Sequence, residues 1–116
     1  MKTINSLFKN LEKEKYEFNR LRTRYPNKIP VIVDSELLTK QKYLVPIDIT
    51  VSQLLFVIRK KLKTVYANEA LFIFFKTKDT QVLKPSNQTI EKVFNECVPE
   101  LDGFLYATLQ KENTFG

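Results

Sequence analysis

Apolar residues at helical spacing mark the N-terminal part of the chain. They predict a short helix over residues 3–9 and a second helix over residues 11–24, each with one apolar face. The pair Tyr25-Pro26 should end the second helix, because proline disfavours helical geometry in the residue before it. The first 25 residues are therefore expected to form two consecutive helices.

Two extended runs follow, over residues 29–33 and 42–46. Pro30 stands near the start of the first run and Pro46 closes the second, positions at which a strand tolerates a missing backbone donor. A polar turn separates the runs, which predicts an antiparallel hairpin. In the second strand, Lys42 and Leu44 should point to one face and Tyr43 and Val45 to the other.

A third amphipathic helix is predicted directly after this hairpin. Thr50 and Gln53 match a capping box, in which each side chain satisfies a free backbone donor of the other residue. Apolar residues at helical spacing continue to Leu62, and the basic stretch 59–63 complements the negative end of the helix dipole.

The remaining elements alternate between strand and helix. Residues 71–75 are all apolar and predict a strand that is buried on both faces, near the centre of a sheet. A short strand at 82–83 follows a basic turn, a helix over 90–98 should stop at Pro99, and the last strand should span 103–109. Cys97 lies on the apolar face of that helix, where a free thiol behaves as a small buried hydrophobe.

The order after residue 27 is hairpin, helix, strand, short strand, helix, strand. This is the order of the α+β ubiquitin-like β-grasp fold, with a mixed sheet of four to five strands and packed helices. Two extra helices precede it. We expect a single domain over 1–116: a helical extension at 1–25, the β-grasp core at 26–109 and a flexible tail at 110–116.

Composition excludes several kinds of chemistry. The 116 residues include one cysteine and no histidine, which rules out an internal disulfide, histidine-based triads and histidine zinc sites. Two glycines are too few for a glycine-rich phosphate loop, and no apolar run is long enough to span a bilayer. We therefore expect no enzyme activity, no cofactor and no metal.

The net charge of +6 is unevenly distributed. Residues 1–30 hold eight basic and three acidic residues, whereas the remaining residues hold eleven and ten. A basic N-terminal region suggests an acidic partner such as a peptide, a membrane surface or a nucleic acid. A solvated helix face explains the same pattern equally well.

Two features suggest how such a domain would act. If the strand at 42–46 forms a sheet edge, an extended peptide can add to it as a further strand. The alternative is that its side chains are ordinary core residues. The chain also ends on Gly116 after a polar segment, and ubiquitin-like modifiers are conjugated through a terminal glycine of this kind.

Specific segments closely resemble one family over essentially the whole chain. They are residues 24–33 (Arg-Tyr-Pro-Asn-Lys-Ile-Pro-Val-Ile-Val), 42–46 (Lys-Tyr-Leu-Val-Pro), 48–51 (Asp-Ile-Thr-Val), 58–60 (Ile-Arg-Lys) and 112–116 (Glu-Asn-Thr-Phe-Gly). The sequence is identified as similar to the autophagy ubiquitin-like modifiers, the family of GABARAP and the microtubule-associated protein light chains.

This resemblance implies conjugation of the Gly116 carboxylate to phosphatidylethanolamine. The implied partners are an activating and a conjugating enzyme, a processing and delipidating cysteine protease, and autophagy receptors with an aromatic-x-x-aliphatic motif. The protein would be cytoplasmic, and on the autophagosome membrane when lipidated. Nucleic acid is not an expected partner.

The resemblance also implies two pockets and a basic rim. The aromatic pocket would use Glu17, Leu21, Pro30, Ile32, Lys42, Leu44 and Phe104. The aliphatic pocket would use Tyr43, Val45, Pro46, Ile49, Leu54 and Val57. The rim of Lys28, Lys40, Lys42 and Lys61 would attract acidic residues that flank the motif.

Departures from the family pattern suggest a divergent member. The turn at 35–41 is short, the stretch 76–84 is unusually basic, and Lys28 stands where arginine is common. Two alternatives remain open at this point. One is a modifier joined to a protein lysine; the other is a non-conjugated adaptor whose basic helices bind tubulin, anionic lipid or RNA.

Overall fold

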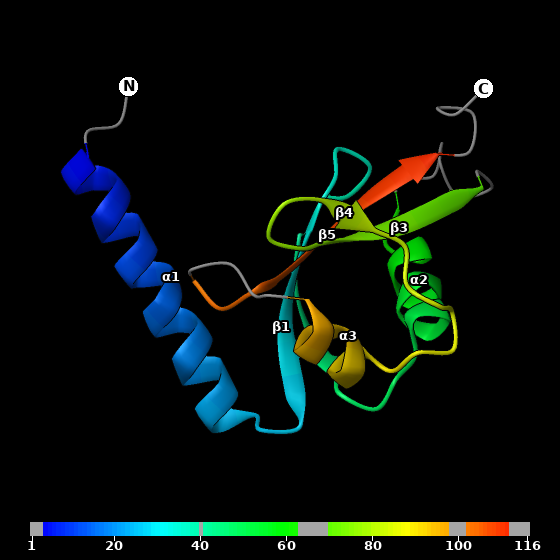
Figure 1. Cartoon of the computed structure of the whole chain (residues 1–116), viewed down its shortest axis with the longest axis horizontal. Coiled ribbons are helices and arrows are strands. Elements are labelled where there is room, and N and C mark those ends of the chain that lie inside the picture. The colour runs from blue at the N-terminus through cyan, green and yellow to red at the C-terminus, as the bar shows by residue number, and fades with distance from the viewer. Residues whose placement is uncertain (1–3, 40, 63–69, 98–101, 112–116) are drawn as a thin grey trace.

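The computed structural model describes residues 4–39, 41–62, 70–97 and 102–111, with side chains described from residue 9. Its elements are α1 (Ile4–Arg24), β1 (Lys28–Asp34), β2 (Lys42–Pro46), α2 (Val51–Arg59), β3 (Leu71–Lys76), β4 (Gln81–Val82), α3 (Ile90–Glu96) and β5 (Leu105–Lys111). The five strands form one sheet in the order β2-β1-β5-β3-β4. Figure 1 shows α1 on one side of this sheet and α2 and α3 on the other.

The sheet is mixed, as the β-grasp prediction requires. β1 and β2 form the predicted antiparallel hairpin, β1 pairs in parallel with β5, and β5 pairs antiparallel with β3. The central strand is therefore β5, and β2 lies at one edge. The predicted α+β ubiquitin-like fold is confirmed.

The main core lies between the sheet and the helices α2 and α3. Ile29, Val31 and Val33 alternate along β1 and are fully buried against this side. The capping box of Thr50 and Gln53 is present at the start of α2. This helix then buries Val51, Leu54 and Ile58 in the same core, at the spacing that the sequence predicted.

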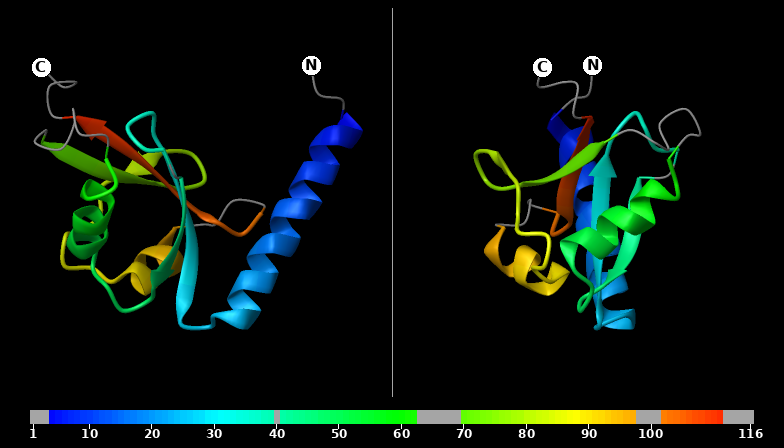
Figure 2. Two further views of the ribbon diagram at one scale, coloured as in Figure 1. Left: turned by 180° about the vertical axis from the view of Figure 1, so that it is seen from behind. Right: turned by 90° about the vertical axis from the view of Figure 1, so that its right-hand side faces the viewer.

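One prediction changes at the N-terminus, where the two expected helices form the single helix α1. No proline or glycine occurs between residues 4 and 24, so nothing in the backbone interrupts the hydrogen-bond ladder. The polar junction around Asn10 weakens the apolar periodicity but is tolerated inside a helix. In Figure 2, α1 diverges from the sheet toward its N-terminal end and approaches it near its C-terminal end.

Several further element boundaries differ from the sequence prediction. Helix α2 ends at Arg59, and Leu62 instead forms an isolated bridge with Leu38. The short strand β4 comprises Gln81–Val82 rather than 82–83. Strand β5 begins at Leu105 because Gly103 turns with a φ of 93°, and it continues through Lys111, two residues into the predicted tail.

Strand β3 lies inside the sheet between β5 and β4, as predicted, but it is buried on only one face. Its residues alternate between buried and more exposed positions, and Phe72 is 37% exposed. The physical reason is that α2 and α3 cover only one face of β3, while α1 lies over the other end of the sheet (Figure 1). A run of apolar residues alone does not distinguish these two environments.

Cys97 is the C-cap of α3 and is 1% exposed, which confirms its predicted buried position. Burial raises the pKa of its thiol, and the Lys84 ammonium opposes this shift. Val98 and Pro99 lie outside the described residues. Among the described helices, none combines the length and apolarity needed to cross a membrane.

Candidate functional site

Strand β2 is an open edge with two different faces. It pairs with β1, and no other strand of the described residues pairs with it. Lys42 and Leu44 face α1, in register with Ile32 and Pro30 of β1. Tyr43 and Val45, the alternate residues, pack toward the main core. The predicted alternation of the strand is thus confirmed.

A cavity of about 170 Å³ lies between α1 and this edge strand. Its lining residues are Glu17 and Leu21 of α1, Pro30 of β1, Lys42, Tyr43 and Leu44 of β2, and Phe104. Six of them belong to the set expected for the aromatic pocket. Ile32, the seventh expected residue, is half-buried on the same face of β1 but does not line the cavity.

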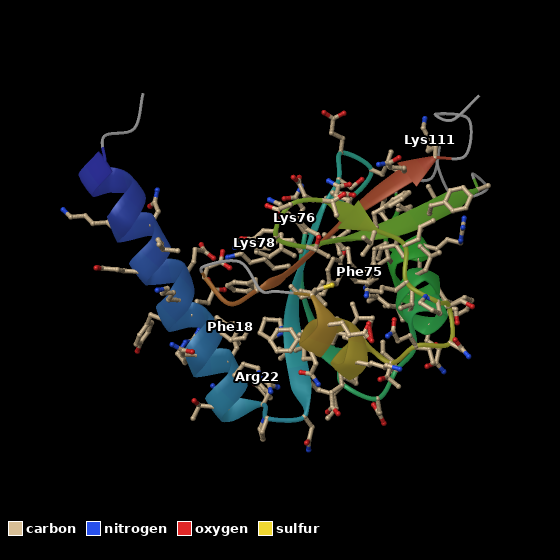
Figure 3. All side chains as sticks on the ribbon, viewed as in Figure 1. Phe18, Arg22, Phe75, Lys76, Lys78 and Lys111 are labelled. Atoms are coloured by element: carbon tan, nitrogen blue, oxygen red, sulfur yellow. The ribbon has the colours of Figure 1, made fainter. Side chains whose placement is uncertain are left out.

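Aromatic rings hold α1 at the distance that leaves this cavity open. Phe18 meets Phe104 edge to face with ring centroids 5.6 Å apart, and it stacks on Phe94 of α3 at 6.2 Å. Gly103 allows this approach, because a Cβ atom there would lie 2.6 Å from the Phe18 ring. Figure 3 shows Phe18 projecting from α1 toward α3.

The loop that carries Phe104 is fixed by its own hydrogen bonds. The backbone N–H of Phe104 donates to the Asp102 carboxylate at 3.0 Å, and the Tyr106 hydroxyl donates to the other oxygen of that carboxylate. Phe104 itself is 1% exposed. Phe104, which lines the cavity, is therefore positioned by hydrogen bonds within its own loop.

Arg22 anchors the last turns of α1 to the beginning of β1. Its guanidinium donates to the carbonyl oxygens of Pro26 at 3.0 Å and Lys28 at 2.6 Å. The same group lies 5.9 Å from the centroid of the Phe94 ring, where a cation and an aromatic face attract each other. Neither Arg22 nor Phe18 was among the site residues predicted from the sequence, because their roles depend on residues distant in the chain.

Lys42 connects the helix to the strand at the mouth of the cavity. Its ammonium donates to Glu17 at 3.1 Å and to Glu14 at 3.4 Å, and it lies 5.6 Å from the centroid of the Phe104 ring. Partial burial lowers the pKa of Lys42, but the hydrogen bonds and charges of the two carboxylates outweigh this effect and raise the pKa. Glu14 was not predicted, although it lies one turn before Glu17 on the same helix face.

The residues expected for the aliphatic pocket are arranged differently. Val45 and Leu54 are 3% and 2% exposed and belong to the main core, whereas Val57 is 44% exposed. Tyr43 and Ile49 are half-buried against that core, and burial raises the pKa of the Tyr43 hydroxyl. Pro46, paired with Lys28, shares the strand face of Leu44 rather than that of Tyr43. Val45 and Leu54 are therefore core residues, whereas Pro46 and Val57 are exposed.

The expected basic rim is only partly described. Lys28 and Lys61 are exposed, and the Lys28 ammonium lies 5.8 Å from the centroid of the Tyr25 ring. Lys40 and Gly116 lie outside the described residues, so their predicted roles stay predictions.

An open strand edge beside an apolar cavity is suited to binding an extended peptide. Backbone groups of the edge supply hydrogen bonds, and the cavity accepts one side chain that projects from the added strand. The positions of Pro30, Leu44 and Phe104 make the interior of that cavity apolar, while Glu17 and Lys42 place charges at its mouth.

Comparison with known proteins shows the family of this chain. A family model described as "Autophagy protein Atg8 ubiquitin like" matches residues 12–116. Autophagy-related protein 8e of Arabidopsis thaliana is 45% identical over 120 residues, covering 96% of this chain and 93% of the relative. Autophagy-related protein 8 of Schizosaccharomyces pombe is 42% identical, covering 90% of this chain and 87% of the relative.

Solved structures show the same fold. The crystal structure of Trypanosoma brucei ATG8 covers 97% of both chains with a TM-score of 0.72 and 30% identity. Plasmodium falciparum Atg8, solved in complex with a Plasmodium falciparum Atg3 peptide, covers 86% of this chain and 89% of its own with a TM-score of 0.70. Its 20% identity supports the fold alone. By the family match, the identity to its relatives and this fold, the chain belongs to the Atg8 family of ubiquitin-like autophagy proteins.

Proposed function

We propose that this protein is a lipid-conjugated modifier that recruits autophagy receptors through the edge of β2. The observation that carries the receptor half of this proposal is the cavity between α1 and β2, lined by Leu21, Pro30, Leu44 and Phe104. Membership of the Atg8 family supports the conjugation half.

A receptor peptide would add to β2 as a sixth strand. Its backbone would bond to the open edge, and its aromatic side chain would enter the cavity over Phe104. Three residues further along the peptide, its aliphatic side chain would contact the surface that includes Tyr43 and Val57. Two apolar anchors of this kind dominate the affinity of a peptide, because exposed charge pairs contribute only about 0.2–1 kcal/mol each.

Conjugation would use the terminal carboxylate. An activating enzyme adenylates the Gly116 carboxylate with ATP and releases pyrophosphate. An enzyme thiol then displaces AMP to form a thioester, which passes to the conjugating enzyme. The amine of phosphatidylethanolamine finally displaces that thiol and forms an amide bond. Membership of the Atg8 family supports the activating and conjugating enzymes as partners. A cysteine protease that processes the precursor and reverses the lipidation completes the proposed partners, and the modified protein would lie on the autophagosome membrane.

Mass spectrometry tests the conjugation directly. The purified protein is incubated with its activating and conjugating enzymes, ATP and phosphatidylethanolamine liposomes. We expect a mass gain equal to the lipid minus water on the C-terminal peptide, and no gain for the Gly116→Ala variant. Lipidation of that variant, or no adduct while a close relative converts in the same mixture, would contradict the proposal. An adduct on a protein lysine instead would favour the protein-conjugated alternative.

A basic adaptor is the second candidate, and the outer face of α1 favours it. Tyr16, which is 70% exposed, lines a shallow hollow of about 380 Å³ with Arg20 and Arg24. None of these residues lines the cavity beside β2, so an acidic surface could bind there independently. Binding to anionic liposomes or tubulin that falls steeply with salt would support this function. Binding that resists salt would count against it.

A further inference from the structure

At the mouth of the aromatic cavity, a lysine ammonium already forms ion pairs with two carboxylates of the same chain. The Lys42 ammonium contacts carboxylates of both Glu14 and Glu17, at 3.4 and 3.1 Å. The three side chains are between 30% and 49% exposed, so solvent and a bound peptide can reach them. We call Glu14, Glu17 and Lys42 the carboxylate clamp. Its formal charge is negative, although the chain as a whole carries +6.

The position of the clamp defines which part of a peptide would meet it. Within an aromatic-x-x-aliphatic motif, the peptide would run from the cavity, which Lys42 and Leu44 line, toward the expected aliphatic anchor site, which includes Pro46 at the end of β2. This direction is parallel to β2, which begins at Lys42. Residues that precede the aromatic anchor therefore pass the start of β2, beside Lys42 and Glu14.

This arrangement disfavours an acidic peptide residue just before the aromatic anchor. The Lys42 ammonium uses two of its three N–H donors on Glu14 and Glu17. A peptide carboxylate must therefore compete for these donors or take the third one beside two carboxylates, and like charges at this distance repel. A peptide ammonium meets the opposite situation, because the two carboxylates together outnumber the single cation.

We propose that the carboxylate clamp sets the specificity of the groove, by acting as an internal competitor for acidic residues before the aromatic anchor. The preferred partners are then peptides with neutral or basic residues at that position. This inference rests on the proposed peptide-binding function. It also revises the role expected for Lys42, whose charge is used within the protein rather than offered to a receptor.

Three synthetic peptides test this specificity. They share one aromatic-x-x-aliphatic core and carry two aspartates, two serines or two lysines before the aromatic residue. Fluorescence anisotropy gives their Kd values for the wild-type protein and for the double variant Glu14→Gln, Glu17→Gln. The control is Glu12→Gln with Glu91→Gln, which changes the net charge equally at two exposed positions that do not line the cavity.

We expect the lysine peptide to bind wild type at least as tightly as the aspartate peptide. Removing the clamp should shift the ratio of their Kd values about five-fold toward the aspartate peptide, from the usual strength of two exposed ion pairs. The control variant should shift this ratio of Kd values much less. Because the ratio compares two peptides on one variant, a general weakening of α1 does not alter it. Glu14→Gln alone, which retains the shorter contact, should give a smaller shift.

A ratio that moves equally in the clamp variant and the control would overturn this specificity role while leaving peptide binding intact. If no peptide binds the wild type, the proposed receptor groove fails as well, and the two failures are therefore distinguishable.

Discussion

The two halves of the proposed groove are built in different ways. The aromatic half is a cavity at the junction between the sheet and a helix that docks on it from outside the core. The aliphatic half rests on the main core itself, where Val45 and Leu54 are almost fully buried and Val57 stays exposed. A gap persists in the first half because rigid aromatic contacts set the distance of α1, whereas close packing fills the second.

This difference has a consequence for stability and binding. A change in the aromatic half can release α1 and leave the core folded. A change at the base of the aliphatic half must disturb the core, since the same side chains serve both. Variants in each half can separate these two outcomes.

The largest effect is expected from Leu54→Ala. Leu54 is 2% exposed, and removing a buried leucine side chain from a packed core costs about 2–5 kcal/mol of unfolding free energy. Chemical denaturation should show this loss, and peptide affinity should fall mainly because less protein is folded. A folded Leu54→Ala protein of normal stability would mean that this half does not rest on the core.

Gly103→Ala should act on the other half. The residue has a φ of 93°, and the new Cβ would lie 2.6 Å from the Phe18 ring. Backbone strain of this kind costs about 1–3 kcal/mol, and here α1 can move away to relieve the contact. Hydrogen exchange should therefore increase in α1 more than in α2, and peptide affinity should decrease.

Cys97 supplies the control for this prediction. It is 1% exposed in the core, and burial raises the pKa of its thiol, so thiol reagents should reach it only when the core opens. Its labelling rate should change much less in Gly103→Ala than the exchange of α1 does. Rapid labelling of Cys97 in this variant would show that α1 and the core unfold together.

A smaller effect on binding should separate the two anchors. Leu44→Ala removes a wall of the preformed cavity and should weaken a receptor peptide about ten-fold, which corresponds to about 1.4 kcal/mol. Val57→Ala removes an already exposed side chain and should weaken the same peptide only about two-fold. Calorimetric titration with thermal melting as a control measures both. Equal losses of peptide affinity would imply that the two halves of the groove contribute equally to binding.

The smallest effect concerns pH. The two carboxylates raise the pKa of Lys42 above its ordinary 10.5, so the clamp stabilises the docked helix fully below that pH. The stabilisation should be lost as the pH rises through the higher pKa of the folded protein. The difference in melting temperature between wild type and Lys42→Gln should be constant near neutral pH and shrink above 10.5. A difference that grows with pH would contradict this role.

Local sequence signals predicted most elements of the fold. The β1–β2 hairpin, the capping box at Thr50 and the buried face of α2 all follow from contacts between neighbouring residues, which the pattern records directly. The lining of the aromatic cavity was also largely predicted, because the family resemblance supplied the residues that converge there. The continuous helix α1 and the exposed face of β3 were not, since periodicity does not show what covers an apolar position.

The amino-acid sequence by itself determined the order of strands and helices, the alternation along β2 and the need for one core beneath the sheet. Only the tertiary structure decided which apolar residues enclose a cavity and which fill the core. It also decided that Lys42 is held by Glu14 and Glu17. These contacts join residues from α1, β1, β2 and the turn before β5, and their distances depend on how α1 packs against Phe104 and Phe94. A linear pattern contains no record of that packing distance.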